Sequence, residues 1–462
     1  MFTLYHTNDL HSEFEYLGKV FAYLKKHRQA DDLYFDAGDL LDLKDSLVSA
    51  DGGYLTLDLV SQFGLDLLAL GNNEIDLGFE GIQSLLDQQF PLICANIHDN
   101  SGQTLRGLPN KRVLTRQGCR LLVIGLAPYY GQGMRADSYN GFFKLGNLMT
   151  GDPFRALEDL FREEEGNYDV CVLLSHSGLE VDQEFLARYP QIDLILGGHS
   201  HDFVITDRYS QVGFMGQGLG RIQIDKVDGI WQIIAMDHIN LEENYDQDFM
   251  EDLEKKRQQA EEMMSLPLKC VSNLSFDPYQ ECPLINFICD CLLDAFPGDL
   301  AIMHHGIAEG PLTLPVSRKS LLELFPSKLN PTYYKLKGSA IIEAYNLSLN
   351  QNHISQEGRG PGFRGHVLGT LAFSHNVLIS DGELFLNGEL VDPDKEYSIV
   401  TDDYLQRGTG YRSLAVPDDV CNYHKWFIRD LVKNYLDRQD IFIQAHKSRT
   451  MNCDLKIDVE GE

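Results

Sequence analysis

The 462-residue sequence predicts an α/β fold in which a mostly parallel β-sheet is covered on both faces by helices. Two observations support this prediction. Short apolar, strand-like runs alternate with amphipathic, helix-like segments through the first 200 residues. Most of the strand-like runs also end in glycine and polar residues, which is typical of the ligand-binding edge of such a sheet.

The predicted elements alternate regularly along this part of the chain. Strand-like runs occupy the first half of 2–11, then 32–36, 65–70, 90–95, 120–125, 169–174 and 192–196. Helix-like segments with apolar residues at helical spacing occupy 17–28, 54–63, 78–89 and 152–165.

Metal-competent side chains lie just past the carboxyl ends of the predicted strands. Any one of them is readily explained as a satisfied loop residue, and an Asp-x-His pair alone is weak evidence. Because the carboxyl ends of parallel strands meet at one edge of a sheet, we expect the whole set to lie close together. The set consists of Asp9, His11, Asp39, Asn72, His176, His199 and His201.

These side chains supply two cation sites. We expect Asp9, His11 and His201 to hold one cation and Asn72, His176 and His199 the other, with Asp39 as the bridge. Two divalent cations about 3.5–4 Å apart clamp a phosphoryl group and activate a shared water as hydroxide. Mixed histidine and aspartate ligands favour Mn²⁺, Zn²⁺, Fe²⁺ or Co²⁺, and Mg²⁺ remains possible.

The composition of the chain limits the classes of binding partner that we expect. The chain has 39 Lys and Arg against 69 Asp and Glu, a formal charge of −30, which argues against long nucleic acids and anionic membranes. No apolar run approaches the roughly 20 residues that span a bilayer, and no targeting segment precedes the first strand. A cytoplasmic location is therefore expected. The nine cysteines include no Cys-x-x-Cys pair, so reduced, buried thiols are expected as well.

Five motifs occur in a fixed order: Asp-x-His at 9–11, Gly-Asp at 38–39, Gly-Asn-x-Glu at 71–74, His176, and Gly-His-x-His at 198–201. This arrangement resembles the calcineurin-like metallophosphatase superfamily. The opening segment His-Thr-Asn-Asp-Leu-His at 6–11 is similar to the bacterial 5′-nucleotidase/UDP-sugar hydrolase family. The resemblance implies a four-layer αββα metallophosphatase domain and a C-terminal α/β substrate domain, joined by a linker helix.

The expected domain boundaries follow from this resemblance and from composition. Residues 1–243 form the expected dimetal catalytic domain and residues 271–462 the nucleotide-binding domain. Residues 244–270 form the linker, whose charged part at 244–264 has few apolar residues and is interpreted as a solvent-exposed helix. An amphipathic helix that docks on a partner is the alternative. Beyond the linker, the pattern predicts helices at 283–296, 317–325 and 340–349, with strands at 300–303 and 333–336.

One residue departs from the family pattern. The family motif is Gly-Asn-His-Glu, whose histidine assists the leaving group or stabilises the transition state; here Asn73 replaces it, while its partner Asp76 is retained. An amide cannot donate a proton as an acid, so a contribution of about 10²–10⁴-fold is lost. A phosphoanhydride leaves as a phosphate and needs no proton, which favours nucleotide-sugar or dinucleotide substrates. Alternatively, Asn73 donates a hydrogen bond to a phosphoryl oxygen and another group supplies the proton.

The resemblance also implies substrate-binding residues in the second domain. Phe363, within Gly-Phe-Arg-Gly, and Tyr411, after Arg-Gly-Thr-Gly, are the expected aromatic pair that sandwiches a base, although both could be core aromatics. Asn330 lies in a similar segment. Ala308 occupies the position of a family arginine, a loss that Arg364, Arg407 or Arg412 would compensate. His304 and His305 are interpreted as loop residues.

The sequence therefore predicts a dimetal phosphohydrolase that releases phosphate from nucleotides or related esters and anhydrides, as a 5′-nucleotidase or nucleotide-sugar hydrolase does. The predicted partner is a small-molecule nucleotide, with no obligate protein partner evident. Two alternatives stay open. One is a cyclic-nucleotide phosphodiesterase or nuclease, and the other is a catalytically weak, nucleotide-binding sensor.

Overall fold

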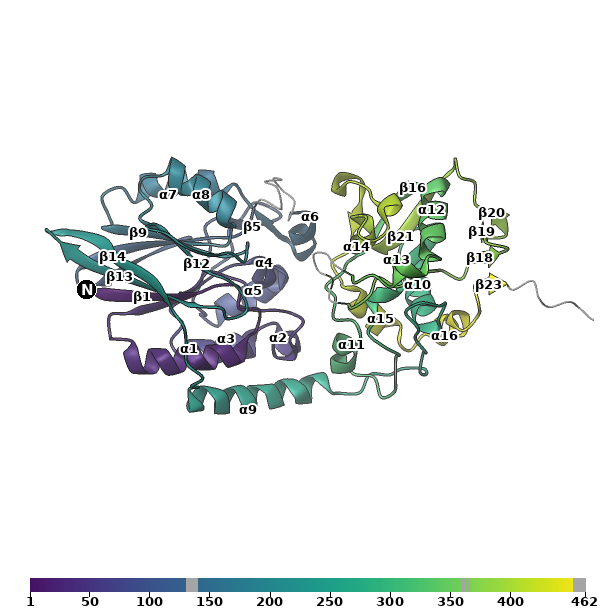
Figure 1. Ribbon diagram of the computed structural model, residues 1–462, viewed down its shortest axis with the longest axis horizontal. Coiled ribbons are helices and arrows are strands. Elements are labelled where there is room, and N and C mark those ends of the chain that lie inside the picture. Colours follow the sequence, from purple (N-terminus) through teal and green to yellow (C-terminus); the bar gives the residue numbers. More distant parts are fainter. Residues whose placement is uncertain (130–139, 359–362, 364, 452–462) are drawn as a thin grey trace, which may run out of the picture. The chain divides into compact units, whose positions relative to one another are not determined.

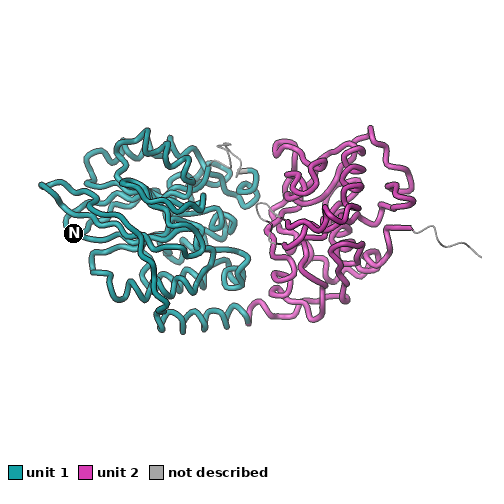
Figure 2. Tube along the Cα trace, in the orientation of Figure 1, with its two compact units in different colours: residues 1–261 teal, residues 262–462 magenta. Residues whose placement is uncertain are grey.

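The computed structural model describes residues 1–129, 140–358, 363 and 365–451. The chain divides into two compact units, residues 1–261 and residues 262–462, which Figure 2 distinguishes by colour. The division lies inside the segment that was expected to be a linker. Each unit has its own sheets and its own core.

Unit 1 contains two six-stranded sheets rather than the one sheet that the alternating pattern predicts (Figure 1). In spatial order, the first sheet consists of β14 (Ile230–Ile239), β13 (Leu219–Val227), β1 (Phe2–Thr7), β2 (Leu33–Asp36), β3 (Leu67–Ala69) and β4 (Leu92–Ile93). The second consists of β11 (Phe203–Ile205), β12 (Tyr209–Val212), β10 (Leu194–Gly197), β9 (Val170–Ser175), β7 (Cys119–Leu126) and β6 (Lys111–Arg116). Strands β5 (Ile97–Asp99) and β8 (Leu148–Thr150) form a separate pair.

The two sheets pack face to face through one apolar core. Leu4 and Phe35 of the first sheet share this core with Val123, Val172 and Leu196 of the second. Helices α7 (Pro153–Glu163) and α8 (Leu179–Arg188) cover the outer face of the second sheet, and α1 (Phe14–His27) and α3 (Tyr54–Gln62) lie on the opposite outer side (Figure 1). Unit 1 therefore has the four-layer αββα architecture that the family resemblance implied.

Short helices complete this unit among the described residues. They are α2 (Ser46–Asp51), α4 (Asn72–Ile75), α5 (Gly78–Asp87), α6 (Asn140–Phe143) and the 3₁₀ turn η1 (Lys144–Gly146).

Parallel pairing brings the strand ends together. In the first sheet β1, β2, β3 and β4 run parallel, and Thr7, the last residue of β1, pairs with Asp36, the last residue of β2. In the second sheet β7, β9 and β10 run parallel, and Ser175 pairs with both Leu126 and Gly197 at the strand ends. The loops that follow β1, β2, β3, β9 and β10 therefore leave the two sheets at the same edge.

The charged helix α9 (Gln247–Met264) has a buried apolar stripe, so it is less exposed than its composition predicted, while its role as a linker stays a prediction. Phe249 and Leu253 are fully buried. The ring of Phe249 packs against Phe21 and Phe63, with centroid separations of 4.9 and 5.2 Å. A thin apolar stripe suffices here because the fully buried side chains recur near one helix turn apart and the remaining surface is charged.

Unit 2 is also an α/β unit (Figure 1). Its five-stranded sheet has the order β17 (Leu371–Phe373), β15 (Leu300–His304), β21 (Glu396–Asp402), β16 (Pro331–Lys337) and β22 (Asn422–Tyr423). A four-stranded sheet consists of β20 (Glu389–Leu390), β19 (Glu383–Leu386), β18 (Val377–Ser380) and β23 (Thr450–Met451). The helices are α10 (Pro283–Ala295), α11 (Arg318–Leu324), α12 (Gly338–Ser348), α13 (Gln351–Ile354), α14 (Asp403–Gln406), α15 (Ile428–Tyr435) and α16 (Gln439–Ala445).

The eight cysteines within the described residues are all free, and six of them are buried. None of the helices described is long and apolar enough to cross a membrane.

Candidate dimetal site

All seven predicted ligands lie at the shared sheet edge. Asp9 and His11 follow β1, Asp39 follows β2, and Asn72 opens α4 after β3. From the second sheet, His176 follows β9, and His199 and His201 follow β10.

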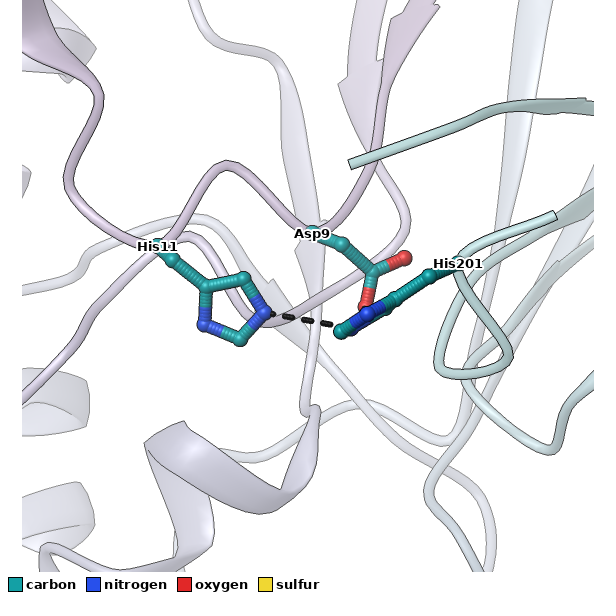
Figure 3. Close-up of side chains that lie close together, drawn as sticks. All are labelled: Asp9, His11 and His201. Carbon is teal, nitrogen blue, oxygen red and sulfur yellow. Dashed lines mark hydrogen bonds and ion pairs between the residues drawn. The ribbon is translucent and has the colours of Figure 1, made fainter. Parts of the chain in front are cut away.

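The first group of ligand atoms comes from Asp9, His11 and His201, which lie within reach of one cation. Figure 3 shows the two imidazoles turned toward each other beside the carboxylate, with 3.3 Å between their Nε2 atoms. The Nε2 atom of His201 lies 3.5 Å from Oδ1 of Asp9. Two imidazole nitrogens and a carboxylate oxygen suit a divalent transition metal.

The second group consists of Asp9, Asp39 and His176, all fully or almost fully buried. Asp39 lies between the two groups. Its Oδ1 is 3.3 Å from Nε2 of His176, while its Oδ2 is 3.9 Å from Nε2 of His11. The carboxylate thus offers one oxygen to each side, which is the geometry a bridging ligand requires.

Asn72 and His199 extend the second group. Oδ1 of Asn72 lies 3.1 Å from Nδ1 of His199, so the two predicted ligand atoms face each other. The backbone N–H of His199 donates to both carboxylate oxygens of Asp9 at 3.0 Å. This contact ties the loop after β10 to the loop after β1.

Five of these ligands have left-handed backbone conformations. The φ angles are +48° for Asp9, +47° for His11, +55° for Asp39, +76° for His199 and +61° for His201. Non-glycine residues rarely adopt such angles, and each costs on the order of 1–3 kcal/mol. Strain of this kind clusters at functional sites because the fold aims the side chains at a common point.

His176 supplies the test of whether a cation fits. Its Nδ1 lies 2.9 Å from the carbonyl oxygen of Ala37, which accepts the hydrogen. Its buried Nε2 therefore faces the carboxylates of Asp9 and Asp39 and makes no hydrogen bond of ordinary geometry. Burial lowers the pKa of His176, but the two carboxylates outweigh burial and raise it to about 10. The site thus demands positive charge at this point, and a divalent cation meets that demand.

Other pKa values in the site follow the same electrostatics. Although burial alone would raise the pKa of Asp39, the neighbouring His176 holds it well below its usual range. Burial and the charge of His176 lower the pKa of His199 to about 4, which keeps its imidazole neutral and able to bind a metal.

Two residues shape the site without having been predicted to do so. The carboxylate of Glu74 accepts hydrogen bonds from the backbone N–H groups of Asp39, Leu41 and Gly71, each at 2.9 Å. Asn8 donates from Nδ2 to Oδ2 of Asp9 at 2.8 Å. The position of Glu74 three residues after Gly71, as in a capping box, was the available signal, whereas no local pattern identified Asn8.

Asn73, in the position of the family histidine, is buried against the bridging carboxylate. Its backbone N–H donates to Oδ1 of Asp39 at 2.8 Å, and its side-chain Nδ2 donates to Oδ2 at 2.6 Å. Asp76, its expected partner, is exposed at the end of α4. Asn73 therefore orients Asp39.

Gly71 is required by this close packing. A Cβ atom at this position would lie 2.2 Å from Oδ1 of Asp39 and 2.4 Å from its backbone nitrogen. Any side chain would displace the bridging carboxylate.

In unit 2 the expected aromatic pair belongs to the apolar core. Phe363 is 5% exposed and its ring stacks on Tyr404, with 4.7 Å between centroids. Tyr411 is fully buried, and its hydroxyl donates to the carbonyl oxygen of Gly369 at 2.9 Å. The structure thus places both rings where the core-aromatic interpretation puts them, and their role in stacking on a base stays a prediction.

The polar residues expected to bind substrate have structural partners. Nδ2 of Asn330 donates to the carbonyl oxygens of His424 and Trp426. Arg407, which is partly exposed, forms an ion pair of 2.7 Å with the buried Asp403. Arg364 lies outside the described residues.

His304 and His305 are not loop residues in the sense that the sequence suggested. Both are fully buried, and Nε2 of His304 lies 3.1 Å from a carboxylate oxygen of the buried Asp402. The interpretation was wrong because His304 completes strand β15 and His305 opens a 3₁₀ turn that packs into the core.

Comparisons with protein families match both units. Residues 2–203 match the calcineurin-like phosphoesterase family, and residues 269–415 match the 5′-nucleotidase C-terminal domain. The uncharacterized metallophosphoesterase YunD of Bacillus subtilis is 28% identical over 465 residues, spanning 93% of this chain and 97% of that protein. Mouse 5′-nucleotidase is 28% identical over 233 residues, 44% of this chain and 38% of the mouse protein.

Solved structures show the same fold. The NAD nucleotidase of Haemophilus influenzae aligns with a TM-score of 0.63 at 14% identity, covering 95% of this chain and 96% of that one. A sulfate thiohydrolase of Thermus thermophilus aligns with a TM-score of 0.53 at 16% identity, covering 95% and 94%. A nucleotidase and a thiohydrolase thus share the architecture, so the substrate has to be argued from the site.

Proposed function

We propose that the substrates of this chain are nucleotides or related phosphoanhydrides. The chain belongs to the calcineurin-like metallophosphoesterases with a 5′-nucleotidase C-terminal domain and is therefore a phosphoester hydrolase. The observation that carries the proposal is a pair of ligand groups that share Asp9. One carboxylate oxygen of Asp39 faces the first group, and the other oxygen faces the second. We assign all seven ligands to two divalent cations, Mn²⁺, Zn²⁺, Fe²⁺, Co²⁺ or Mg²⁺.

When bound, two such cations offset the charge of the phosphoryl oxygens and lower the pKa of a water molecule. The protein's own residues hold the ligands in place. Glu74 fixes the loop that carries Asp39, and Asn73 orients the Asp39 carboxylate. In the proposal, Asp9 and Asp39 hold the two ligand groups close enough together for both cations to act on the same phosphoryl group.

Asn73 determines the preferred leaving group in this proposal. Its amide donates a hydrogen bond to Asp39 and has no acidic proton to give to a departing alkoxide. Esters such as nucleoside monophosphates need that proton, whereas anhydrides such as nucleotide sugars and dinucleotides release a phosphate that does not. We therefore propose that anhydrides are cleaved faster than monophosphates.

Unit 2 supplies the proposed nucleoside-binding surface. We assign the base to Phe363 and Tyr411, and the phosphates to Arg364 and Arg407, with Asn330 holding the backbone nearby. The support is the match to the 5′-nucleotidase C-terminal domain and the partial exposure of Arg407. The eight cysteines of the described residues are free and six of them are buried, which supports the proposal of a reducing, cytoplasmic location.

A nucleotide-binding sensor with weak turnover is the second candidate. Asn73 favours this candidate, because it replaces the family histidine and its side-chain amide donates to Asp39 instead. A nuclease or cyclic phosphodiesterase is less well supported, since a diester also releases an alkoxide and the charge of −30 repels nucleic acid.

The test measures phosphate release by the Mn²⁺-loaded protein from nucleoside monophosphates, UDP-sugars, dinucleotides and cyclic nucleotides. We expect turnover of anhydrides, and we expect Asn73→His to raise monophosphate turnover on the order of 10²-fold. The exposed Asn167→His is the matched control and should change nothing. Bound nucleotide without turnover of any substrate would favour the sensor, and fast monophosphate turnover unaffected by Asn73→His would refute the leaving-group argument.

A further inference from the structure

His201 differs from the other histidines of the site in how its ring is held. The ring of His176 is fully buried and fixed through Nδ1 by Ala37, and the ring of His199 lies against that of His176, with 5.2 Å between centroids. The side chain of His201 is 41% exposed. Among the described residues, its Nδ1 has no hydrogen-bond partner, so the polar contacts of this ring are confined to Nε2, the atom that faces Asp9 and His11.

Phe214 makes the orienting contact that His176 obtains from its hydrogen bond to Ala37. Its ring stacks on the imidazole of His201, with 4.8 Å between centroids and 9° between planes. A parallel ring at this distance restricts rotation of the imidazole about its side-chain bonds, while leaving Nε2 directed at Asp9 and His11.

The segment that carries Phe214 is anchored to the metal site itself. It connects β12 to β13, and the backbone N–H of Met215 donates to the carbonyl oxygen of Asp9 at 2.8 Å. Nδ2 of Asn8 donates to the carbonyl oxygen of Gly213 at 2.6 Å. Gly213, Met215 and Gly216 have φ angles of +78°, +48° and +78°, which fold the segment into a tight loop. These hydrogen bonds thus fix the position of the Phe214 ring relative to Asp9, another ligand of the same group.

We propose that Phe214 is a positioning residue that holds the imidazole of His201 for the cation bound by Asp9, His11 and His201. The inference rests on the proposed function, because it takes these three residues as ligands. Without the ring of Phe214, the His201 imidazole must lose its rotational freedom when the cation binds, which lowers the affinity for that cation. The affinity for the cation at His176 and His199 is unaffected.

The test is calorimetric titration of the chelator-treated full chain with Mn²⁺. We expect two cations per wild-type chain, one held more weakly than the other. Phe214→Ala should weaken the weaker position by roughly 3- to 10-fold, the size of a stacked aromatic contact, and leave the tighter position unchanged. Phe214→Tyr keeps the ring and should restore wild-type affinity.

Tyr23→Ala is the matched control. Tyr23 stacks on His27 of α1, with 4.2 Å between centroids, outside the seven ligands and their loops. Its removal should leave both affinities unchanged. Equal affinities in wild type and Phe214→Ala, or equal weakening of both positions, would overturn the inference and leave the proposed function standing. A wild-type chain that binds fewer than two cations would overturn both.

Discussion

The sheet edge of unit 1 and the aromatic cluster of unit 2 look similar in sequence but differ in structure. Both contain glycine-rich segments with polar or aromatic residues at expected positions; those of unit 1 follow strands, and those of unit 2 follow the short helices α13 and α14. At the edge of unit 1, the fold holds ligands in strained backbone conformations and leaves Nε2 of His176 facing two carboxylates. In unit 2, Phe363 stacks on Tyr404, and the hydroxyl of Tyr411 is satisfied by Gly369. Left-handed backbone at non-glycine residues therefore distinguishes the sheet edge of unit 1 from the aromatic cluster of unit 2.

The largest expected effect comes from the bridging carboxylate. Asp39→Asn removes the negative charge that lies between the two ligand groups, so we expect kcat to fall roughly 10²- to 10³-fold. Phosphate release and metal content of the purified protein measure this. The surface residue Asp87, paired with Arg106, is the control, and Asp87→Asn should leave kcat unchanged. Full activity of Asp39→Asn would place the reaction elsewhere.

A smaller but still large effect is expected from Gly71→Ala. The added methyl group would overlap Oδ1 and the backbone nitrogen of Asp39, which must then move. Because displacement of a reacting group by about 1 Å can cost about 10²-fold, kcat should fall by that order. In unit 2, Gly310 has no atom within 4 Å of the corresponding position, and Gly310→Ala should be silent. Similar activities for the two variants would argue against a tightly constrained Asp39.

Acid should destabilise unit 2 through His305, whereas the pKa of His176 in unit 1 is shifted in the opposite direction. Burial lowers the pKa of His305 in unit 2 to about 4, below its ordinary value of 6.5. As the pH falls from 6.5 to 4, His305 is protonated in the unfolded chain but stays neutral in the folded protein. The free energy of unfolding therefore declines by up to about 3 kcal/mol. His305→Asn should remove this decline while keeping the hydrogen bond to the carbonyl oxygen of Asp277.

Urea unfolding at several pH values measures this prediction. Trp426 is the fluorophore of unit 2 once Trp231 of unit 1 has been replaced by phenylalanine, since the chain has two tryptophans. Taking the difference between His305→Asn and its parent cancels the other titrating groups. Parallel pH profiles would show that His305 is protonated or exposed in the folded protein.

The smallest effect is expected from Tyr411→Phe, which removes one hydroxyl and leaves the ring. The carbonyl oxygen of Gly369 loses its donor, so the free energy of unfolding should fall by about 1 to 2 kcal/mol. KM for nucleotides should remain unchanged, because the hydroxyl faces the core. Tyr279→Phe, at an exposed position, is the control. A several-fold rise in KM at unchanged stability would instead place the hydroxyl at the ligand.

Local patterns predicted the elements well where burial imposed a period. The apolar run 120–125 corresponds to β7 (Cys119–Leu126), and the helical pattern 54–63 corresponds to α3 (Tyr54–Gln62). The arrangement of strands into two sheets was not accessible from the pattern, because periodicity says which residues are buried but not which strands pair. The exposed edge strand β14 was missed for lack of an alternating apolar face.

The site was predictable to the extent that its residues follow strands. Asp39 and His176 were identified by position alone, because parallel strands deliver their ends to one edge. Spacing marks the contact of Glu74 with Gly71, but its contacts with Asp39 and Leu41, that of Asn8 with Gly213 and that of Phe214 with His201 join residues distant in the sequence, which no spacing rule marks. Phe363 and Tyr411 were assigned from resemblance, and the same residue types serve equally well in a core.

The left-handed conformation of His11 has a consequence for how this sequence can change. Glycine at that position would relieve the strain and stabilise a chain that never bound metal, since glycine adopts φ angles near +47° without penalty. Stability alone would therefore select against the histidine. Its presence marks a trade-off in which activity preserves a residue that folding does not favour. Lineages that abandon the reaction should therefore first replace the five ligands with left-handed backbone conformations by glycine or asparagine.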